Sequence, residues 1–273
     1  MKRVFALATI LALSATMLMG CAEASAKNDD GKSSRATTTR EYGYITSFGA
    51  LQAQQGVAVV YTVSEGPAKV TLKATAGTCE GYEARLDKSG TLVLGVKGNG
   101  SIRGRKGVSA TFYVSGPAVK AITAGSASRV DVKGTYSVKG ELKMKAASAS
   151  EIVIGAVSAD EVEIDAASAS SVRVAQSCTC RDMAIEASSA AEVAIKGLKT
   201  NELEVDAASA SSVSVSGTAD KVEYEAASSA KIAAKGLKAA RGQAKAASCA
   251  IIDCNVGQLK QQIASYGSVN NKR

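Results

Sequence analysis

The stretch DAASASSVRV, residues 165–174, recurs along the chain and determines the expected fold. Its edited copies read TAGSASRVDV, KAASASEIVI, EASSAAEVAI, DAASASSVSV, EAASSAKIAA and KAASCAIIDC. In each copy one serine stands four places before a valine or isoleucine, and these serines are Ser126, Ser148, Ser168, Ser189, Ser209, Ser228 and Ser248. Successive serines are 22, 20, 21, 20, 19 and 20 residues apart. A fixed period near 20 residues is typical of a solenoid, whose repeats stack on one another.

Within a copy the apolar pattern has a period of two, which indicates strands. One side of an extended chain carries Val162, Ile164, Ala166, Ser168, Ser170, Val172 and Val174. We therefore expect an all-β fold, a parallel β-helix with coils of about 20 residues, each with two apolar strands around a small-residue corner. Only small side chains fit inside a sharp corner. The seven serines are accordingly predicted to point inward as a structural ladder that is hydrogen-bonded from coil to coil.

The first 40 residues predict export and anchoring. Residues 1–20 combine a basic start with an apolar run that ends in LMGC (18–21), which resembles a bacterial lipobox. We expect a lipoprotein signal peptide, lipidation of Cys21 and an outer-membrane location facing the periplasm or the cell surface. An ordinary cleaved signal peptide is the alternative. Residues 21–40 are polar and predict a disordered tether.

The β-helix domain is expected over residues 41–268. Residues 41–120 predict N-terminal strands that cap the helix, at 57–64, 68–75, 91–97 and 109–115, and the turn EGP (65–67) predicts a hairpin between the first two. Regular coils are expected over residues 121–257. Residues 258–273 lose the repeat and predict a C-terminal cap and tail.

Composition excludes several classes of function. The chain contains no histidine, which removes the commonest general base and zinc ligand. Its 33 Lys and Arg outnumber 25 Asp and Glu, but they are spread along the chain with only three Phe, eight Tyr and no Trp. Nucleic-acid binding usually needs a basic stripe interleaved with aromatic residues, so we expect no nucleic-acid partner.

Carboxylates recur on the outward side of one strand in successive copies. They are Glu161, Glu163, Asp165, Asp182, Glu186, Glu202, Glu204, Asp206, Glu223 and Glu225, with Lys143, Lys145, Arg241 and Lys245 in the same columns at either end. One hypothesis is a face that binds divalent cations or a cationic partner, with calcium as the candidate ion and no other cofactor expected. The alternative is a solvated face that discourages aggregation.

Five cysteines follow Cys21, namely Cys79, Cys178, Cys180, Cys249 and Cys254. Because five is odd, at least one thiol is expected to be free or to pair between chains. Cys249 and Cys254 are close enough for a local bridge if the chain turns between them. Tyr42, Tyr44, Phe48 and Tyr82, with the glycine-rich basic loop 95–108, are candidates for contacts with a sugar or for packing in the cap.

Two segments outside the repeats make a family resemblance specific. They are SFGALQAQQGVAVVYTV (47–63) and ATFYVSGPAVKAITAGSAS (110–128). Together with the repeats, they resemble Gram-negative lipoproteins described as putative autotransporter-adhesin, head GIN-domain proteins. The resemblance covers about residues 41–268 and implies a right-handed β-helix with an adhesin-like role, without an established ligand or catalytic residue.

We therefore expect a non-catalytic, membrane-anchored, adhesin-like protein that binds a glycan, matrix or envelope partner. A structural protein that self-assembles in the envelope is the alternative, and thiol-sensitive oligomers would favour it. A polysaccharide-acting β-helix enzyme is the third candidate, because such folds often carry lyases and hydrolases, and polymer degradation would identify it.

Overall fold

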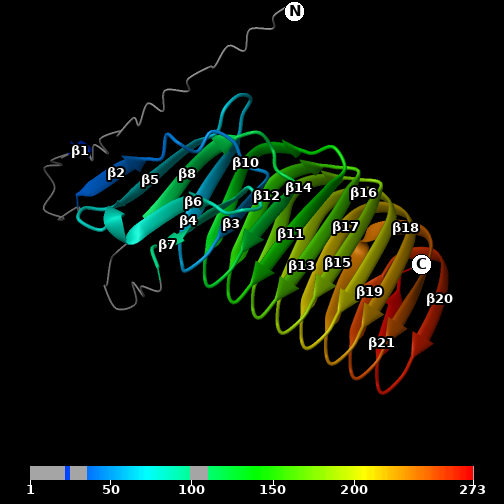
Figure 1. Cartoon of the computed structure of the whole chain (residues 1–273). Helices are drawn as coiled ribbons and strands as arrows, with labels where there is room; N and C mark the ends of the chain where they lie inside the picture. The colour runs from blue at the N-terminus through cyan, green and yellow to red at the C-terminus, as the bar shows by residue number, and fades with distance from the viewer. Residues whose placement is uncertain (1–21, 25–35, 99–109, 273) are drawn as a thin grey trace, which may run out of the picture.

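The computed structural model describes residues 22–24, 36–98 and 110–272 of the 273-residue chain. These residues form a parallel β-solenoid with a group of shorter strands at its N-terminal end (Figure 1). The predicted all-β solenoid is confirmed. None of the described helical segments is long and apolar enough to span a membrane.

The N-terminal strands combine parallel and antiparallel pairing. They are β1 (Ala22–Ala24), β2 (Thr37–Glu41), β3 (Ala50–Ala53), β4 (Ala58–Val63), β5 (Lys69–Thr75), β6 (Tyr82–Leu86), β7 (Thr91–Val96) and β8 (Ala110–Gly116), with one 3₁₀ turn at Cys79–Gly81. The predicted hairpin between β4 and β5 is wrong. Strand β8 lies between them, parallel to β4 and antiparallel to β5. The turn at EGP reverses the chain as expected, but a turn signal does not specify which strand fills the space beside it.

The coils are built from strands that pair in parallel with the next coil. They are β9 (Ala121–Ala124), β10 (Arg129–Ser137), β11 (Glu141–Ala147), β12 (Glu151–Ser158), β13 (Glu161–Ala167), β14 (Ser171–Thr179), β15 (Asp182–Ala187), β16 (Glu192–Ala207), β17 (Ser212–Ala226), β18 (Lys231–Ala246), β19 (Ile251–Cys254), β20 (Val256–Ile263) and β21 (Ser268–Asn271). Strands β20 and β21 pair with β18 and β19, so the segment predicted as a cap contributes a further coil.

A first coil precedes the repeats that the sequence displays. Strands β3 and β4 pair in parallel with β9 and β10, in the register Ala50↔Ala121 and Ala58↔Arg129. The corner between β3 and β4 is Gln55-Gly56, and the Gly56 amide donates to the Ser126 carbonyl oxygen at 2.8 Å. Strands β5 to β8 are therefore an insertion in the sequence between the first coil and the second, and within it β7 and β8 pair in parallel with the other edges of β3 and β4.

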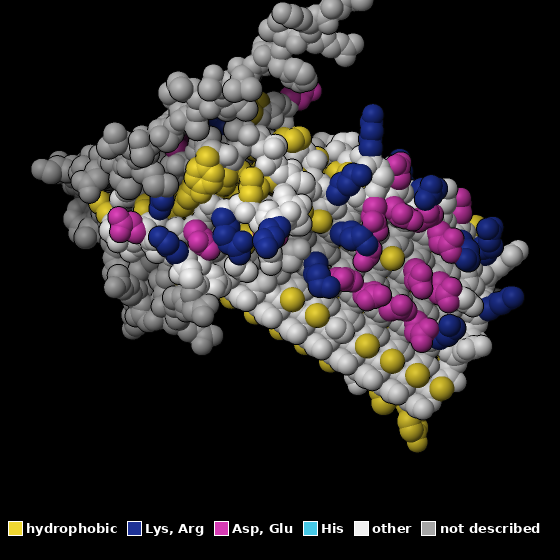
Figure 2. Space-filling model, in the orientation of Figure 1, with side chains coloured by type: hydrophobic (Ala, Val, Ile, Leu, Met, Phe, Trp, Pro, Cys, Tyr) yellow, Lys and Arg dark blue, Asp and Glu magenta, His cyan; other side chains and the backbone are white. Residues whose placement is uncertain are grey.

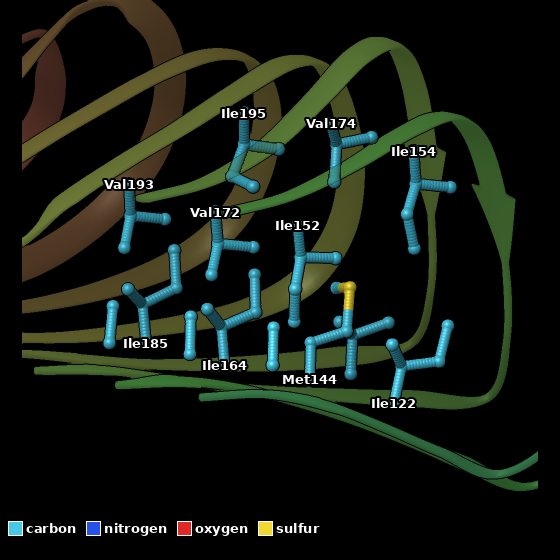
Figure 3. Close-up of a cluster of buried hydrophobic side chains, with 14 of the residues drawn as sticks. Ile122, Met144, Ile152, Ile154, Ile164, Val172, Val174, Ile185, Val193 and Ile195 are labelled. Carbon is cyan, nitrogen blue, oxygen red and sulfur yellow. The ribbon is translucent and has the colours of Figure 1, made fainter. Parts of the chain in front are cut away.

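The solenoid interior is a stack of aliphatic side chains. Ile164 lies beside Ile185 in the register of β13 and β15, and Val172 lies beside Val193 in that of β14 and β16. Figure 3 shows these side chains pointing into one shared core. Burying a side chain of this size stabilises the fold by roughly 1.5–3 kcal/mol, so the repeated columns supply most of the driving force.

The prediction that the seven marker serines point inward is wrong. Ser126, Ser148, Ser168, Ser189, Ser209, Ser228 and Ser248 are all exposed, with φ between 52° and 56°. The residue after each of them also has a positive φ. Two successive left-handed residues form a turn that projects outward, so the strict alternation of an extended chain does not hold across the corner.

In four of the seven corners a buried serine two places after the marker serine closes the corner from inside, at Ser128, Ser150, Ser170 and Ser211, whereas Ala191, Ala230 and Ala250 take this place in the others. Ser170 Oγ accepts a hydrogen bond from the Ala167 amide at 3.0 Å and donates one to the Ala146 carbonyl of the preceding coil at 2.8 Å. The corners also stack through their backbones, because the Ala169 amide donates to the Ser189 carbonyl at 2.9 Å. Inside the corner, small residues are therefore required because there is little room. Outside it, serine and alanine tolerate the left-handed backbone conformation.

The corner conformation makes Ala169→Gly a stabilising change. Alanine in the left-handed region costs roughly 1–2 kcal/mol, whereas glycine adds only about 0.5–1 kcal/mol of chain entropy. We expect urea unfolding to show a gain of ~0.5–1 kcal/mol. The control Ala167→Gly lies in an extended strand and should lose a similar amount. Equal effects of the two variants would contradict the left-handed corner.

The cysteines differ sharply in accessibility. Among the described residues, Cys178, Cys180, Cys249 and Cys254 are free thiols; Cys249 is exposed at a corner, and the other three, like Cys79, are buried. The local bridge between Cys249 and Cys254 is therefore absent from the structure. A hydrogen bond between the thiols of Cys178 and Cys180 raises the pKa of Cys178 and lowers that of Cys180.

Thiol titration should follow this burial. In native protein comprising residues 22–273, we expect one thiol to react rapidly with Ellman's reagent and the buried thiols to react only after unfolding. The variant Cys249→Ser should lose the rapid phase. A rapid phase that persists in this variant would show that a buried cysteine is accessible.

Candidate functional site

The ten predicted carboxylates lie together on one side of the solenoid. This acidic face comprises Glu161, Glu163, Asp165, Asp182, Glu186, Glu202, Glu204, Asp206, Glu223 and Glu225, on β13, β15 and the C-terminal halves of β16 and β17. Figure 2 shows the face as a patch of acidic side chains bordered by Lys and Arg. Each strand pairs with the neighbouring coils, so the backbone fixes the position of each acidic residue's Cα atom along the solenoid axis.

Strand register arranges the acidic face in three columns. The first contains Glu161, Asp182 and Glu202, and the second contains Glu163, Glu204 and Glu223, interrupted by Ala184. The third is an unbroken row of Asp165, Glu186, Asp206 and Glu225. Neighbouring strands are ~4.8 Å apart, and like charges directly opposite each other are destabilising. The face therefore costs folding free energy.

Basic side chains neutralise the two ends of the acidic face. At one end Lys143 bonds to Glu163 and Lys145 Nζ lies 3.1 Å from Asp165. At the other end Lys245 Nζ lies 3.5 Å from Glu223 and 3.3 Å from Glu225. In the first column, Lys221 pairs with Glu202 and Arg181 with Asp182.

The centre of the face remains uncompensated. Among the described residues, no Lys or Arg lies within 4 Å of a carboxylate of Glu186, Glu204 or Asp206. Burial, together with the charges of Glu204, Glu225 and Glu223, raises the pKa of Asp206. A cation bound beside these three residues would therefore gain more electrostatic free energy than elsewhere on the face.

The raised pKa gives Asp206→Asn a pH-dependent effect. The ionised carboxylate is disfavoured in the folded state, so the variant should be more stable than the parent at pH 7, by ~0.2–1 kcal/mol. The gain should shrink as the pH falls through the raised pKa and disappear below the ordinary value of 3.8, where the carboxyl is protonated in both the folded and the unfolded state. Thermal melts between pH 3 and 7 test this, and a gain that is constant with pH would contradict it.

Two hollows follow the acidic columns. One of about 520 Å³ runs across the coils beside the third column, with Lys145 at one end and a floor of Ala147, Ala167, Ser188, Ala208 and Ala227. The other, of about 420 Å³, lies over the first and second columns. Strand alternation puts each of these small residues on the same side as the charged residue two places before it. The sequence alone does not reveal that they line a groove, because the left-handed corner that follows them carries no sequence signal.

The described residues contain no group of three or more Asp, Glu or Cys side chains that could hold a metal ion. Calcium takes six to eight oxygen ligands from several directions, whereas these carboxylates project side by side from a flat sheet. The arrangement instead suits several separate positive charges along the columns.

The other predicted sites are distributed differently. Cys21 lies outside the described residues. Tyr42 and Tyr82 are buried in the core, and Phe48 packs against Tyr61 with ring centroids 6.0 Å apart. Of the four aromatic candidates for contact with a sugar, only Tyr44 is largely exposed, at 62 %.

Several solved structures share this fold over nearly their whole length. A protein described as a putative adhesin from Parabacteroides merdae is 15% identical with a TM-score of 0.63, over 89% of this chain and 98% of its own. One from Parabacteroides distasonis is 16% identical, with a TM-score of 0.62 over 89% and 98%. One from Bacteroides fragilis is 15% identical, with a TM-score of 0.61 over 88% and 98%. At these identities the similarity shows the fold.

Sequence comparison assigns the family. No curated protein sequence matches this chain. A family model described as "Putative auto-transporter adhesin, head GIN domain" matches residues 47–216 and again residues 174–272. The two matches overlap and together span the first coil, the insertion and the later coils. The chain therefore belongs to the family that this model describes, the head GIN-domain family.

Proposed function

We propose that this adhesin-like β-solenoid is a non-catalytic binding protein of the bacterial cell envelope, anchored to the outer membrane by a lipid on Cys21. Its acidic face binds a partner that presents several positive charges. Basic segments of a matrix or envelope protein, or a glycan rich in amino groups, have this chemistry. The leader that ends in LMGC (18–21) supports the anchor.

The uncompensated centre of the acidic face is the observation that carries this proposal. A sheet that gathers Glu186, Glu204 and Asp206 without basic partners within 4 Å loses stability through repulsion. A cationic partner relieves this repulsion when it binds. The paired strands also hold the backbone that carries these carboxylates in place, so little backbone conformational entropy is lost on binding.

The site chemistry supports binding rather than catalysis. The chain has no histidine. Glycoside hydrolysis needs two carboxyl groups on opposite sides of the scissile bond, whereas the acidic face projects its carboxylates in one direction from one sheet. Extended grooves along such a sheet suit an elongated polymer that is held rather than cleaved.

A binding screen tests the proposal. Protein comprising residues 22–273 would be titrated with basic peptides, amino-sugar polymers and matrix proteins at low and physiological salt. The triple variant E186Q/E204Q/D206N should weaken saturable binding ~10-fold or more, because each exposed ion pair contributes up to about 1 kcal/mol. A matched control, E41Q/E65Q/E80Q, removes three exposed charges from the N-terminal region, outside the acidic face, and should bind like the parent.

Two outcomes would contradict the proposal. Unchanged binding by the triple variant would exclude the acidic face as the site. Shortening of a polymer during the assay would show that the chain is an enzyme, and thereby refute the non-catalytic role.

A further inference from the structure

The C-terminal end of the solenoid concentrates exposed apolar side chains. The described residues contain six large hydrophobic side chains that are exposed, and three of them, Ile251, Ile263 and Tyr266, lie on the last two coils. Tyr266 is 94 % exposed and Ile263 is 51 % exposed. Apolar side chains gathered in this way at one end of a soluble domain mark a contact surface.

These three side chains surround the last corner. Tyr266 is the second left-handed residue of that corner, and Ile263 ends the strand that leads into it. Ile251 pairs in register with Ser268, which follows the corner. Figure 2 shows hydrophobic side chains at the lower edge of this end and Lys and Arg side chains on the flank above them.

The same end is strongly basic. Residues 231–272 carry seven basic side chains and one acidic one, Asp253; the basic set is Lys231, Lys235, Lys238, Arg241, Lys245, Lys260 and Lys272. Lys235 pairs with Asp253 and Lys245 with Glu223 and Glu225. The other five have no acidic partner within 4 Å among the described residues. They stand free to meet an anionic partner.

The exposed edge of the last coil is poorly suited to pairing with a β-strand of another protein. Among the described strands, β20 pairs only with β18 and β21 only with β19, which leaves one free edge. Lys260 lies on this edge, and lysine on an edge strand discourages strand addition. The Asn271 amide group fills the end of the coil, bonding to the Val256 amide and carbonyl, each at 2.9 Å. A second copy joined through this same end would bring two basic ends together.

We propose that this end of the solenoid docks on an anionic lipid surface. Tyr266 and Ile263 enter the headgroup region, while Lys260 and Lys272 contact lipid phosphates. Aromatic side chains with one polar end favour the membrane interface, and lysines beside it are attracted to anionic headgroups. An anionic polysaccharide could bind the lysines, but it has no apolar region for the side chains around the last corner. The combination of basic and apolar side chains therefore favours a lipid surface.

This docking does not depend on the acidic face and can be tested separately. Protein comprising residues 22–273, which contains every described strand, would be mixed with phosphatidylcholine vesicles that contain or lack phosphatidylglycerol. We expect sedimentation with the anionic vesicles only. The variant K260Q/K272Q should lower the partition coefficient about 25-fold, at roughly fivefold per basic residue. The variant I263S/Y266S should lower it about 10-fold or more.

A matched control separates local contact from net charge. The variant K88Q/K139Q removes two exposed lysines outside this end and should partition like the parent. Circular dichroism would confirm that each variant is folded. Equal losses in this control and in K260Q/K272Q would overturn the proposal, as would absence of binding to anionic vesicles.

Two further outcomes would assign the end to other partners and overturn the lipid proposal. Binding to soluble heparin that is insensitive to I263S/Y266S, without vesicle binding, would indicate a polyanion. Salt-sensitive self-association that K260Q/K272Q abolishes, without vesicle binding, would indicate the acidic face of a second copy. The vesicle and heparin results leave the binding of cationic polymers to the acidic face untouched, so the two proposals can fail separately.

Discussion

Replacing Gly217 by alanine is expected to lower the free energy of unfolding by ~3 kcal/mol or more. A Cβ atom at this position would lie 2.0 Å from the Leu198 carbonyl oxygen and 2.5 Å from its amide nitrogen. Both atoms belong to the backbone of the preceding coil, so no side-chain rotation relieves the clash. The φ of +136° adds strain, because side chains of L residues rarely tolerate it.

Urea unfolding of Gly217→Ala beside Gly49→Ala measures this effect. A Cβ atom added at Gly49 would meet no other atom within 4 Å, and the φ of Gly49 is not left-handed. Its replacement should therefore change stability by less than about 0.5 kcal/mol. If Gly217→Ala were equally mild, adjacent coils would have to separate more easily than the parallel pairing of β16 and β17 implies.

Truncating Leu203 to alanine should cost about 2–5 kcal/mol. Leu203 is completely buried and lies between Met183 and Val222 in one inward column. Parallel strands fixed by backbone hydrogen bonds cannot collapse into the space that the side chain leaves, which favours the upper part of this range. The loss should appear as a lower Tm and a lower urea midpoint.

The control for Leu203→Ala is Leu86→Ala, at a side chain that is 41 % exposed near the free edge of β6. We expect it to cost less than about 1 kcal/mol, because the site is already hydrated. A similar cost at the two positions would mean that the coil interior is not close-packed.

The inward-facing columns and the alignment of the acidic residues could be predicted almost completely from the sequence. Positions such as Val162, Ile164 and Val172 are predicted inward and are buried, because the spacing of the repeat and the alternation of a strand both leave one solution. The alignment of Asp165, Glu186 and Asp206 follows from the same spacing.

The corners and the first coil could not be predicted in the same way. Ser168-Ala169 contains neither glycine nor asparagine, the residues that usually signal a positive φ, so the outward turn carries no local signature. Gln55-Gly56 does carry that signature, but β5 to β8 separate it from the later copies and conceal the repeat. Pairing of β8 between β4 and β5 depends on contacts distant in sequence, which turn residues do not encode.

Because each corner stacks on the next, the length of the solenoid can change only by whole coils. Each coil advances a surface column by ~4.8 Å through backbone hydrogen bonds, whatever the side chains are. Removing residues 190–209, one corner-to-corner unit, would shorten the acidic columns by one step and leave the remaining steps unchanged. Members of such a lineage can thus change the reach and the number of their charges by gaining or losing coils, while the spacing that a partner must match stays constant.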